Sequence, residues 1–325
     1  MKIIITGGLG FIGSTFIKKA IKNKNINIFN IDKKTYASFD HNKKLIKSSS
    51  YKYYKIDISN YIKLKNIISK IKPDYIINFA AETHVDRSIE DPSVFIKSNI
   101  MGTFNILKSI KNLNLIKKTS FIQISTDEVF GSSKSKIPFN ENSKYSPNSP
   151  YSASKASADH LVRSFYKTYN LKTIIVHPSN NFGPFQYLEK LIPVIVTCCI
   201  NKKRIPIYGK GKQVRDWLFV EDTADAIYKI MLNGKIGENY NITTRNLLSN
   251  IQLVKMICLI YDKITNSNQN SFKLVKFVKD RPGHDFKYNI SNKKITHQLG
   301  WKFKKNFKQK LKITINWYIQ NYKKK

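Results

Sequence analysis

The 325-residue sequence has few cysteines and few acidic residues, and no apolar run long enough to cross a bilayer. Its three cysteines, Cys198, Cys199 and Cys258, are odd in number and include an adjacent pair, which excludes a disulfide framework and metal-site spacing. We therefore predict free thiols in a reducing cytoplasm, and no metal. The longest apolar stretch is 191–200, and residues 1–7 have neither the apolar segment nor the cleavage site of a signal peptide. The sequence predicts a soluble chain without a membrane partner.

Arginine is scarce as well. Only six of the 57 basic residues are arginine, and with 21 acidic residues the formal net charge is +36. A nucleic-acid reader uses arginine for base edges and gathers its positive charge in one region. The lysines here are spread along the whole sequence, so we predict a solvated surface and no specific nucleic-acid partner. A non-catalytic basic protein bound to RNA remains the alternative.

The last 25 residues, 301–325, carry nine lysines and no acid. Apolar residues nevertheless recur there at helical spacing, namely Phe307, Leu311, Ile315, Tyr318 and Tyr322. This pattern predicts an amphipathic closing helix with lysine stems along its edges. A helix lying on a membrane surface is the alternative.

The first half of the chain alternates short β-rich runs with helical segments. Strands are predicted at 2–6, 26–31, 52–56, 75–79, 121–125 and 173–176, with helices at 14–22 and before Pro73. Because helical crossovers imply parallel pairing, we predict an α/β fold with a Rossmann-like doubly wound parallel sheet over 1–176. Residues 177–325 are predicted to form a smaller substrate-binding lobe with loops at 177–184, 205–212 and 280–284, while 219–241 can return to the first domain.

A glycine-rich run follows the first predicted strand directly. Residues 7–13 read Gly-Gly-Leu-Gly-Phe-Ile-Gly, and a helix is expected to follow. Glycines allow a tight turn and let backbone N–H groups approach a pyrophosphate at the helix N-terminus. Asp32 ends the next strand, where a carboxylate can accept hydrogen bonds from ribose hydroxyls. This favours NAD over NADP, although the positive charges of Lys33 and Lys34 weaken the preference. Asp57 and Ile58 follow the third strand, where an adenine edge could be held.

Two further segments suit acid–base chemistry. Tyr151 and Lys155 share one helix face, and a neighbouring ammonium stabilises a phenolate, so the pair can deprotonate a hydroxyl. Asp127 and Glu128 follow a buried strand and can both reach one ligand only if the chain turns there, which Gly131 favours. A carboxylate and a carboxylic acid together are what elimination of water requires.

These segments resemble the nucleotide-sugar 4,6-dehydratases of the extended short-chain dehydrogenase/reductase family. The shared motifs are GGLGFIGS (7–14), TYAS (35–38), FAAETHVDRS (79–88), STDEVFG (125–131), PYSASKASAD (150–159), SNNFGPFQ (179–186), EKLIP (189–193), PIYGKGKQVRDWLFVED (206–222) and DRPGHD (280–285). The resemblance implies a hydro-lyase with tightly bound NAD that dehydrates a nucleoside-diphosphate glucose. The implied substrate is dTDP-glucose, with UDP-glucose as the alternative, and the product a 4-keto-6-deoxy sugar for deoxysugar (rhamnose) biosynthesis. An epimerase or decarboxylase of the same fold is a further alternative, but those enzymes do without the Asp-Glu pair.

The resemblance also implies residue roles. Thr126 would bond the sugar O4, Tyr151 would deprotonate it, and Lys155 would bind the nicotinamide ribose. Glu128 would remove the C5 proton and Asp127 would protonate the departing C6 hydroxyl. The implied cofactor site comprises Gly7, Gly10, Phe11, Ile12, Gly13, Asp32, Lys33, Thr35, Asp57, Ile58, Phe79, Ala80, Ala81, Thr83, Ser98, Tyr151, Lys155 and Asn181. The implied substrate site comprises Thr83, Thr126, Asn180, Lys190, Leu191, Pro206, Ile207, Tyr208, Arg215, Asn250, Asp280, Arg281 and His284. Arg215 and Arg281 are two of only six arginines, and the bidentate guanidinium group suits a diphosphate better than lysine does.

Three points complete the expectations. His84 is predicted to be a structural hydrogen-bonding residue, not a general base. A homodimer is implied through helices at 100–113 and 153–169. Departures from the family pattern at 36–39, 242–244 and 286–287 leave the identity of the base open, but they touch none of the reacting groups.

Overall fold

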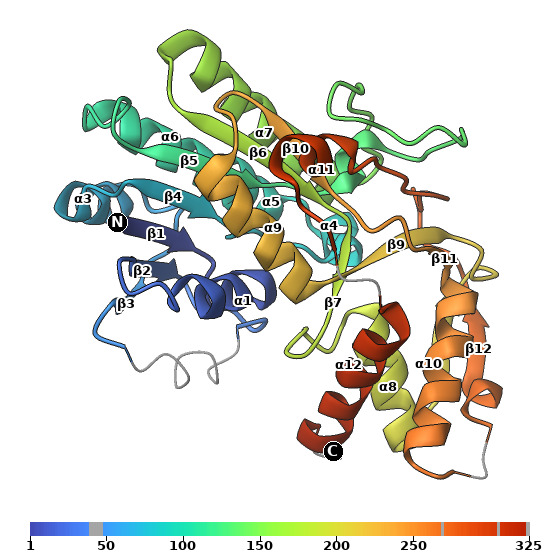
Figure 1. The fold of residues 1–325 in the computed structure, drawn as a ribbon. Coiled ribbons are helices and arrows are strands. Elements are labelled where there is room, and N and C mark those ends of the chain that lie inside the picture. Colours follow the sequence, from blue (N-terminus) through green and yellow to red (C-terminus); the bar gives the residue numbers. More distant parts are fainter. Residues whose placement is uncertain (39–47, 268–269, 304–305, 323–325) are drawn as a thin grey trace.

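The computed structural model describes residues 1–38, 48–267, 270–303 and 306–322. Within these ranges, seven parallel strands form the main sheet in the order β10-β6-β5-β4-β1-β2-β3 (Figure 1). They are β1 (Lys2–Thr6), β2 (Asn27–Asp32), β3 (Tyr51–Lys55), β4 (Tyr75–Asn78), β5 (Ser120–Ile124), β6 (Thr173–Pro178) and β10 (Asn239–Ile242). The predicted doubly wound parallel sheet is confirmed.

Helices cover both faces of this sheet because its central strands are apolar on both sides. Ile3 and Ile5 of β1 pack under α1 (Phe11–Ala20), α9 (Val220–Asn233) and α11 (Lys293–Leu299). Ile4 faces the opposite core, which includes α3 (Tyr61–Ile71), α6 (Gly102–Asn112) and α7 (Pro150–Tyr169). Figure 1 shows α1 and α9 in front of the sheet. Three short elements, α4 (Val85–Glu90), α5 (Ser93–Phe95) and the π-helix η1 (Ile96–Met101), lead into α6.

The first helix begins three residues earlier than the sequence predicts. Ser14 N donates to Gly10 O at 3.0 Å, so Gly13 already lies inside α1. A Cβ at Gly13 would lie 2.5 Å from Gly7 O. The predicted start at Ser14 was wrong. Gly13 allows the helix to pack closely against the loop and is not itself part of the turn.

The second lobe has its own small sheets and core. Among the described residues, β11 (Leu247–Ser249), β9 (Val214–Phe219) and β7 (Asn180–Phe182) form one sheet, and β12 (Val275–Val278) pairs with β8 (Ile205–Tyr208). Helices α8 (Leu191–Asn201), α10 (Asn250–Ile264) and α12 (Phe307–Asn321), with the short η3 (Ser271–Leu274), complete it. Figure 1 shows α8, α10 and α12 grouped together, apart from the main sheet.

Two segments predicted as loops contain strands. Segment 177–184 includes the end of β6 and all of β7, and segment 205–212 includes β8. The prediction was wrong because strands of three or four residues with Asn or Pro in them show no clear alternation of apolar and polar residues.

The closing helix has the predicted apolar face. Leu311, Ile315 and Tyr318 of α12 are buried in the core of the second lobe, while Tyr322 follows the end of the helix.

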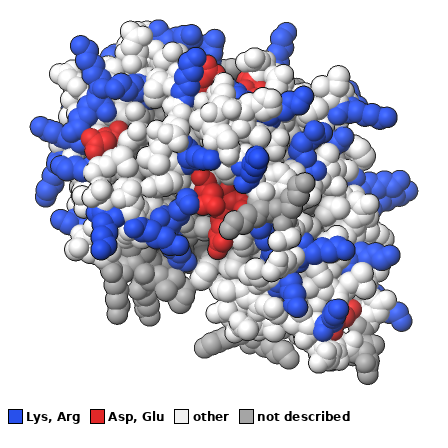
Figure 2. All heavy atoms as spheres, viewed as in Figure 1, with Lys and Arg blue, Asp and Glu red and all other residues white. Residues whose placement is uncertain are grey.

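Within the described ranges, no helix combines the length and the apolar character needed to cross a bilayer. Cys198, Cys199 and Cys258 are free, as predicted. Figure 2 shows lysine and arginine side chains scattered over the visible face and not gathered into one patch.

Candidate active site

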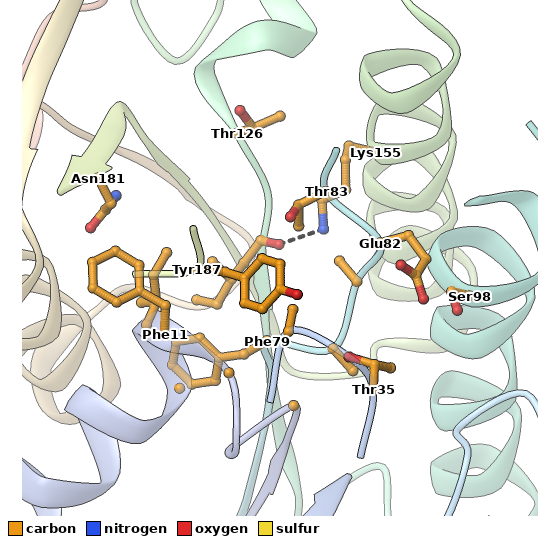
Figure 3. A pocket seen from close by; sticks show the side chains of 18 of the residues that line it. Phe11, Thr35, Phe79, Glu82, Thr83, Ser98, Thr126, Lys155, Asn181 and Tyr187 are labelled. Atoms are coloured by element: carbon orange, nitrogen blue, oxygen red, sulfur yellow. Dashed lines mark hydrogen bonds between the residues drawn. The ribbon is translucent and has the colours of Figure 1, made fainter. Parts of the chain in front are cut away.

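A cavity of about 300 Å³ lies at the carboxyl ends of the strands, where the strand order reverses between β1 and β4. In doubly wound sheets this reversal opens a crevice for ligands. Figure 3 looks into the cavity, with Thr126 and Lys155 towards one end and Thr35 towards the other. All the residues of the implied cofactor site line it: Gly7, Gly10, Phe11, Ile12, Gly13, Asp32, Lys33, Thr35, Asp57, Ile58, Phe79, Ala80, Ala81, Thr83, Ser98, Tyr151, Lys155 and Asn181. Their contacts with a cofactor stay a prediction.

The helix that follows the glycine loop begins without a side-chain cap from the described part of the chain. Gly10 is the N-cap of α1, and no side chain in the described ranges caps this helix. Gly7 has φ +72°, a backbone conformation that residues with side chains rarely adopt. A Cβ at this position would also lie 2.6 Å from Ala80 N, so the position requires glycine. An uncapped helix N-terminus behind a glycine-rich loop fits a pyrophosphate.

Asp32 combines a structural role with a place on the cavity wall. Its side chain accepts hydrogen bonds from Leu9 N at 3.0 Å and from Lys34 N at 2.7 Å. Burial raises the pKa of Asp32, and these two bonds oppose that shift. Lys33 Nζ lies 3.0 Å from Glu82 Oε1 and 3.2 Å from Ser98 Oγ. Because Glu82 offsets the charge of Lys33, that lysine is poorly placed to compensate a 2′-phosphate, which strengthens the preference for NAD.

The predicted turn after β5 is present. Asp127–Phe130 form a 3₁₀ helix (η2) with Thr126 as its N-cap, and Thr126 Oγ1 accepts from Glu128 N at 3.3 Å. Gly131 ends the turn with φ +74°. The turn brings Asp127 and Glu128 to the wall of the same cavity, although they are neighbours in sequence.

Different neighbouring charges act on the carboxyl groups of Asp127 and Glu128 and shift their pKa values differently. Burial, then the charges of Glu128 and Asp216, raises the pKa of Asp127 well above its usual value, with Arg215 opposing. Asp127 Oδ2 has no hydrogen-bond partner within the described residues. Burial also raises the pKa of Glu128, but Arg215, Arg281 and Lys190 oppose it. This asymmetry favours a protonated Asp127 beside an ionised Glu128, the arrangement of a general acid and a general base.

Tyr151 and Lys155 lie on the first turns of α7, which Ser149 caps through a capping box with Ser152. Tyr151 N donates to Ser88 Oγ at 3.2 Å. Burial, then the charge of Glu128, raises the pKa of Tyr151. Burial lowers the pKa of Lys155 to about 8, and the charge of Asp159 opposes this. Lys155 Nζ donates to Ile124 O at 2.6 Å, which fixes the ammonium beneath the strand end.

The implied substrate residues fall into two groups. Thr83, Thr126, Asn180 and Lys190 line the cavity. The others lie outside its described lining, in the second lobe: Leu191, Pro206, Ile207, Tyr208, Arg215, Asn250, Asp280, Arg281 and His284. Their roles stay predictions.

The two arginines assigned to the diphosphate are already engaged. Arg215 donates to Val214 O and to Asp285 O, both at 2.9 Å, and its guanidinium lies 4.1 Å from the centre of the Tyr288 ring. Arg281 Nη1 lies 3.2 Å from Asp86 Oδ1. Their charges nevertheless act on Glu128. His84 behaves as expected, because its Nδ1 caps α4 by accepting from Arg87 N at 3.4 Å.

Sequence reasoning missed Tyr288. Its hydroxyl lies 3.2 Å from Glu128 Oε2 and 2.9 Å from Asp285 Oδ2, so it connects Glu128 to the second lobe. The residue follows the motif at 280–285 by three positions, and proximity to that motif was the one available signal.

Sequence reasoning also missed a group of four residues at the cavity, two of which line it. We call Tyr36, Arg87, Tyr187 and Glu189 the mouth cluster. The Arg87 guanidinium lies 3.9 Å from the centre of the Tyr36 ring and 3.3 Å from Glu189 Oε2. Tyr36 and Tyr187 meet edge to face at 5.1 Å. Because these residues come from three separate segments, the cluster joins the two lobes across the cofactor side of the cavity; Tyr187 and Glu189 themselves line it.

Comparison with known proteins agrees with this site. The sequence profile described as GDP-mannose 4,6 dehydratase matches residues 4–314. The chain is 44% identical over 333 residues to the dTDP-glucose 4,6-dehydratase of Haemophilus influenzae, covering 99% of this chain and 98% of that one.

Two solved structures are similar over almost the whole chain. The dTDP-glucose 4,6-dehydratase of Bacillus anthracis in complex with NAD is 37% identical with a TM-score of 0.88, covering 99% of this chain and 97% of that one. The dTDP-glucose 4,6-dehydratase of Streptomyces venezuelae with NAD bound is 34% identical with a TM-score of 0.91, covering 99% and 98%. The chain therefore belongs to the nucleotide-sugar 4,6-dehydratases, the family that the GDP-mannose 4,6 dehydratase profile describes and in which its relatives are dTDP-glucose 4,6-dehydratases.

Proposed function

We propose that the chain catalyses the NAD-dependent dehydration of dTDP-glucose to dTDP-4-keto-6-deoxy-glucose and water. One observation carries the proposal: a glycine loop, a Tyr–Lys pair and an adjacent Asp–Glu pair line a single cavity. The relatives named dTDP-glucose 4,6-dehydratase, and the two neighbours solved with NAD, support the same substrate and cofactor.

The first step is oxidation at C4 of the glucose. The N–H groups at the start of α1 would hold the cofactor diphosphate, and Asp32 would accept from a ribose hydroxyl. NAD, when bound, takes up the hydrogen from C4 and gives it back at C6. The Lys155 ammonium stabilises Tyr151 as a phenolate. Thr126 holds the C4 hydroxyl while this phenolate removes its proton and becomes a neutral tyrosine.

The second step is elimination of water across C5 and C6. The C4 ketone acidifies the C5 proton, which Glu128 removes as a base. Asp127 gives its proton to the departing C6 hydroxyl, and its raised pKa keeps that proton available at neutral pH. Glu128 returns its proton to C5, leaving Tyr151 protonated and Asp127 ionised. One proton must therefore pass from Tyr151 to Asp127, directly or through solvent, before the next turnover.

The competing activities fit less well. An epimerase or a decarboxylase of this fold would use Tyr151 and Lys155 and would have no need of the adjacent Asp127 and Glu128, the first buried and the second half-buried. UDP-glucose remains a second candidate substrate because it differs in the base and not at the reacting carbons. Comparing turnover of dTDP-glucose with that of UDP-glucose separates the two, and we expect dTDP-glucose to have the higher kcat/KM.

Assembly and cellular context are also proposals. We propose a homodimer through α6 and α7; Ile96 and Met101, which precede α6, are 50% and 45% exposed and could be covered there. The free thiols support a reducing cytoplasm, and the product suits deoxysugar biosynthesis. We propose that 1–176, together with 219–241, bind the cofactor and that the rest of 177–325 binds the nucleotide sugar.

The proposed function is tested by following deuterium placed at C4 of dTDP-glucose. The label should appear at C6 of the same product molecule, as read by mass spectrometry and NMR of mixed labelled and unlabelled substrate. Label lost to solvent, or label still at C4 in the product, would overturn the proposal.

A further inference from the structure

A buried carboxylate lies one helical turn beyond Lys155, and the proposed reaction does not use it. Asp159 of α7 is 1% exposed. Together with Ser125, Tyr145 and His177 it forms a group that we call the Asp159 cluster. The four residues come from α7, the end of β5, the loop before α7, and β6. Four segments thus converge on one carboxylate behind the active site.

Two hydroxyl groups hold this carboxylate. Ser125 Oγ donates to Asp159 Oδ2 at 2.5 Å, and Tyr145 Oη donates to the same oxygen at 3.3 Å. His177 Nε2 lies 2.7 Å from Tyr145 Oη and 3.4 Å from Asp159 Oδ2. Both hydroxyl groups donate to the same carboxyl oxygen, so the cluster fixes the position of the Asp159 side chain.

The Asp159 cluster lies one helical turn from Lys155. Lys155 and Asp159 are spaced i, i+4 and so share one face of α7. Lys155 is 2% exposed and donates one of its three protons to Ile124 O at 2.6 Å. Burial lowers the pKa of Lys155 to about 8, and Asp159 is the group that opposes this shift. Without an opposing carboxylate, burial would lower the pKa of Lys155 further.

The far side of Asp159 borders a second cavity of about 430 Å³. The charged and titratable groups around this cavity are Glu141, Lys144, Tyr145, Asp159, His160, Arg163, Tyr166, Lys167, Glu238 and Lys294. Glu238 and Lys294 neutralise one another at 2.6 Å, and His160 packs against the Tyr145 ring. On the active-site side, the charge of Asp159 also acts weakly on Tyr151. Outside the cluster itself, Lys155 is the active-site cation on which the charge of Asp159 acts.

We propose that Asp159 is a positioning residue that keeps Lys155 in its charged form, and that Ser125, Tyr145 and His177 hold the Asp159 carboxylate in place for this task. The inference rests on the proposed function, because it concerns the lysine that stabilises the Tyr151 phenolate. Asp159 acts through Lys155 and touches neither the substrate nor the cofactor.

The test is the pH dependence of kcat for Asp159→Asn, with Asp159→Ser as an independent second neutral variant. Removing the carboxylate lowers the pKa of Lys155, so the decline of kcat on the alkaline side should begin about one pH unit lower. Activity lost at neutral pH should return on acidification. Asp159→Glu, which restores the charge, should bring the alkaline limb back towards its original position.

A matched control is Asp262→Asn. Asp262 lies on α10 and also accepts hydrogen bonds from a serine, Ser271, but it is far from Lys155 in the fold. Its variant should keep the original alkaline limb. An equal loss of kcat at every pH in the Asp159 variants, with the limb unmoved, would show a merely structural role and overturn the inference. If neither the unsubstituted enzyme nor the Asp262 variant makes the keto sugar, the proposed function itself falls.

Discussion

The sharpest prediction concerns the division of labour between Asp127 and Glu128. In Asp127→Asn the acid that protonates the C6 hydroxyl is gone, while Glu128 and its neighbours remain. General acid catalysis contributes about a hundred- to ten-thousandfold. Asp127 is 3% exposed, so solvent has little access to replace its proton. We therefore expect kcat to fall about a thousandfold, which corresponds to about 4 kcal/mol of transition-state stabilisation.

The assay that separates the two carboxyl groups is exchange at C5 in deuterium oxide. With Asp127→Asn, Glu128 still removes the C5 proton after C4 oxidation, so recovered dTDP-glucose should carry deuterium at C5. With Glu128→Gln, both exchange and water loss should stop. Asp225→Asn, at the exposed ion pair with Lys19, is the control and should behave like the unsubstituted enzyme. Exchange that persists in Glu128→Gln and stops in Asp127→Asn would refute the assignment.

Three further predictions follow from the same geometry. Burial raises the pKa of Asp127 above the value in the unfolded chain, so this carboxyl group destabilises the fold only at pH values above its unfolded pKa. Asp127→Asn should therefore raise the Tm at neutral pH, and this gain should disappear near pH 3. An equal gain in Tm at both pH values would contradict the argument. Arg87→Ala removes the centre of the mouth cluster, so NAD should be lost faster during gel filtration, as read from bound nucleotide; unchanged retention would exclude a role for the cluster in holding the cofactor. Gly13→Ala places a Cβ 2.5 Å from Gly7 O and should reduce NAD binding in calorimetry more than Ala156→Ser does elsewhere.

Much of the fold could be predicted because β1 and its neighbours are apolar on both faces, a pattern that only a sheet covered by helices satisfies. The glycine-rich turn and the shared helix face of Tyr151 and Lys155 could also be predicted, because both depend on residues close together in the sequence. Strands β7 and β8 were missed because a few residues that pair with distant segments leave no periodic signal. Tyr288 was missed for a related reason, since its contact with Glu128 joins residues 160 positions apart.

The arginines illustrate a different limit. Their scarcity made Arg215 and Arg281 stand out as diphosphate ligands, and their charges do reach Glu128. Yet Arg215 donates to three backbone carbonyls and stacks on Tyr288. A sequence shows that a guanidinium is present, but only the folded chain shows which acceptors have already occupied it.

Helix α4 has a consequence for anyone who exchanges parts between relatives. Its consecutive residues Asp86, Arg87 and Ser88 bond, in turn, to Arg281, to Glu189 and to the backbone of Tyr151. One short helix thus touches both edges of the second lobe and the reacting tyrosine. A chimaera that imports a foreign second lobe must import a matching α4 with it, or the transplanted half will meet the wrong side chains at both Asp86 and Arg87.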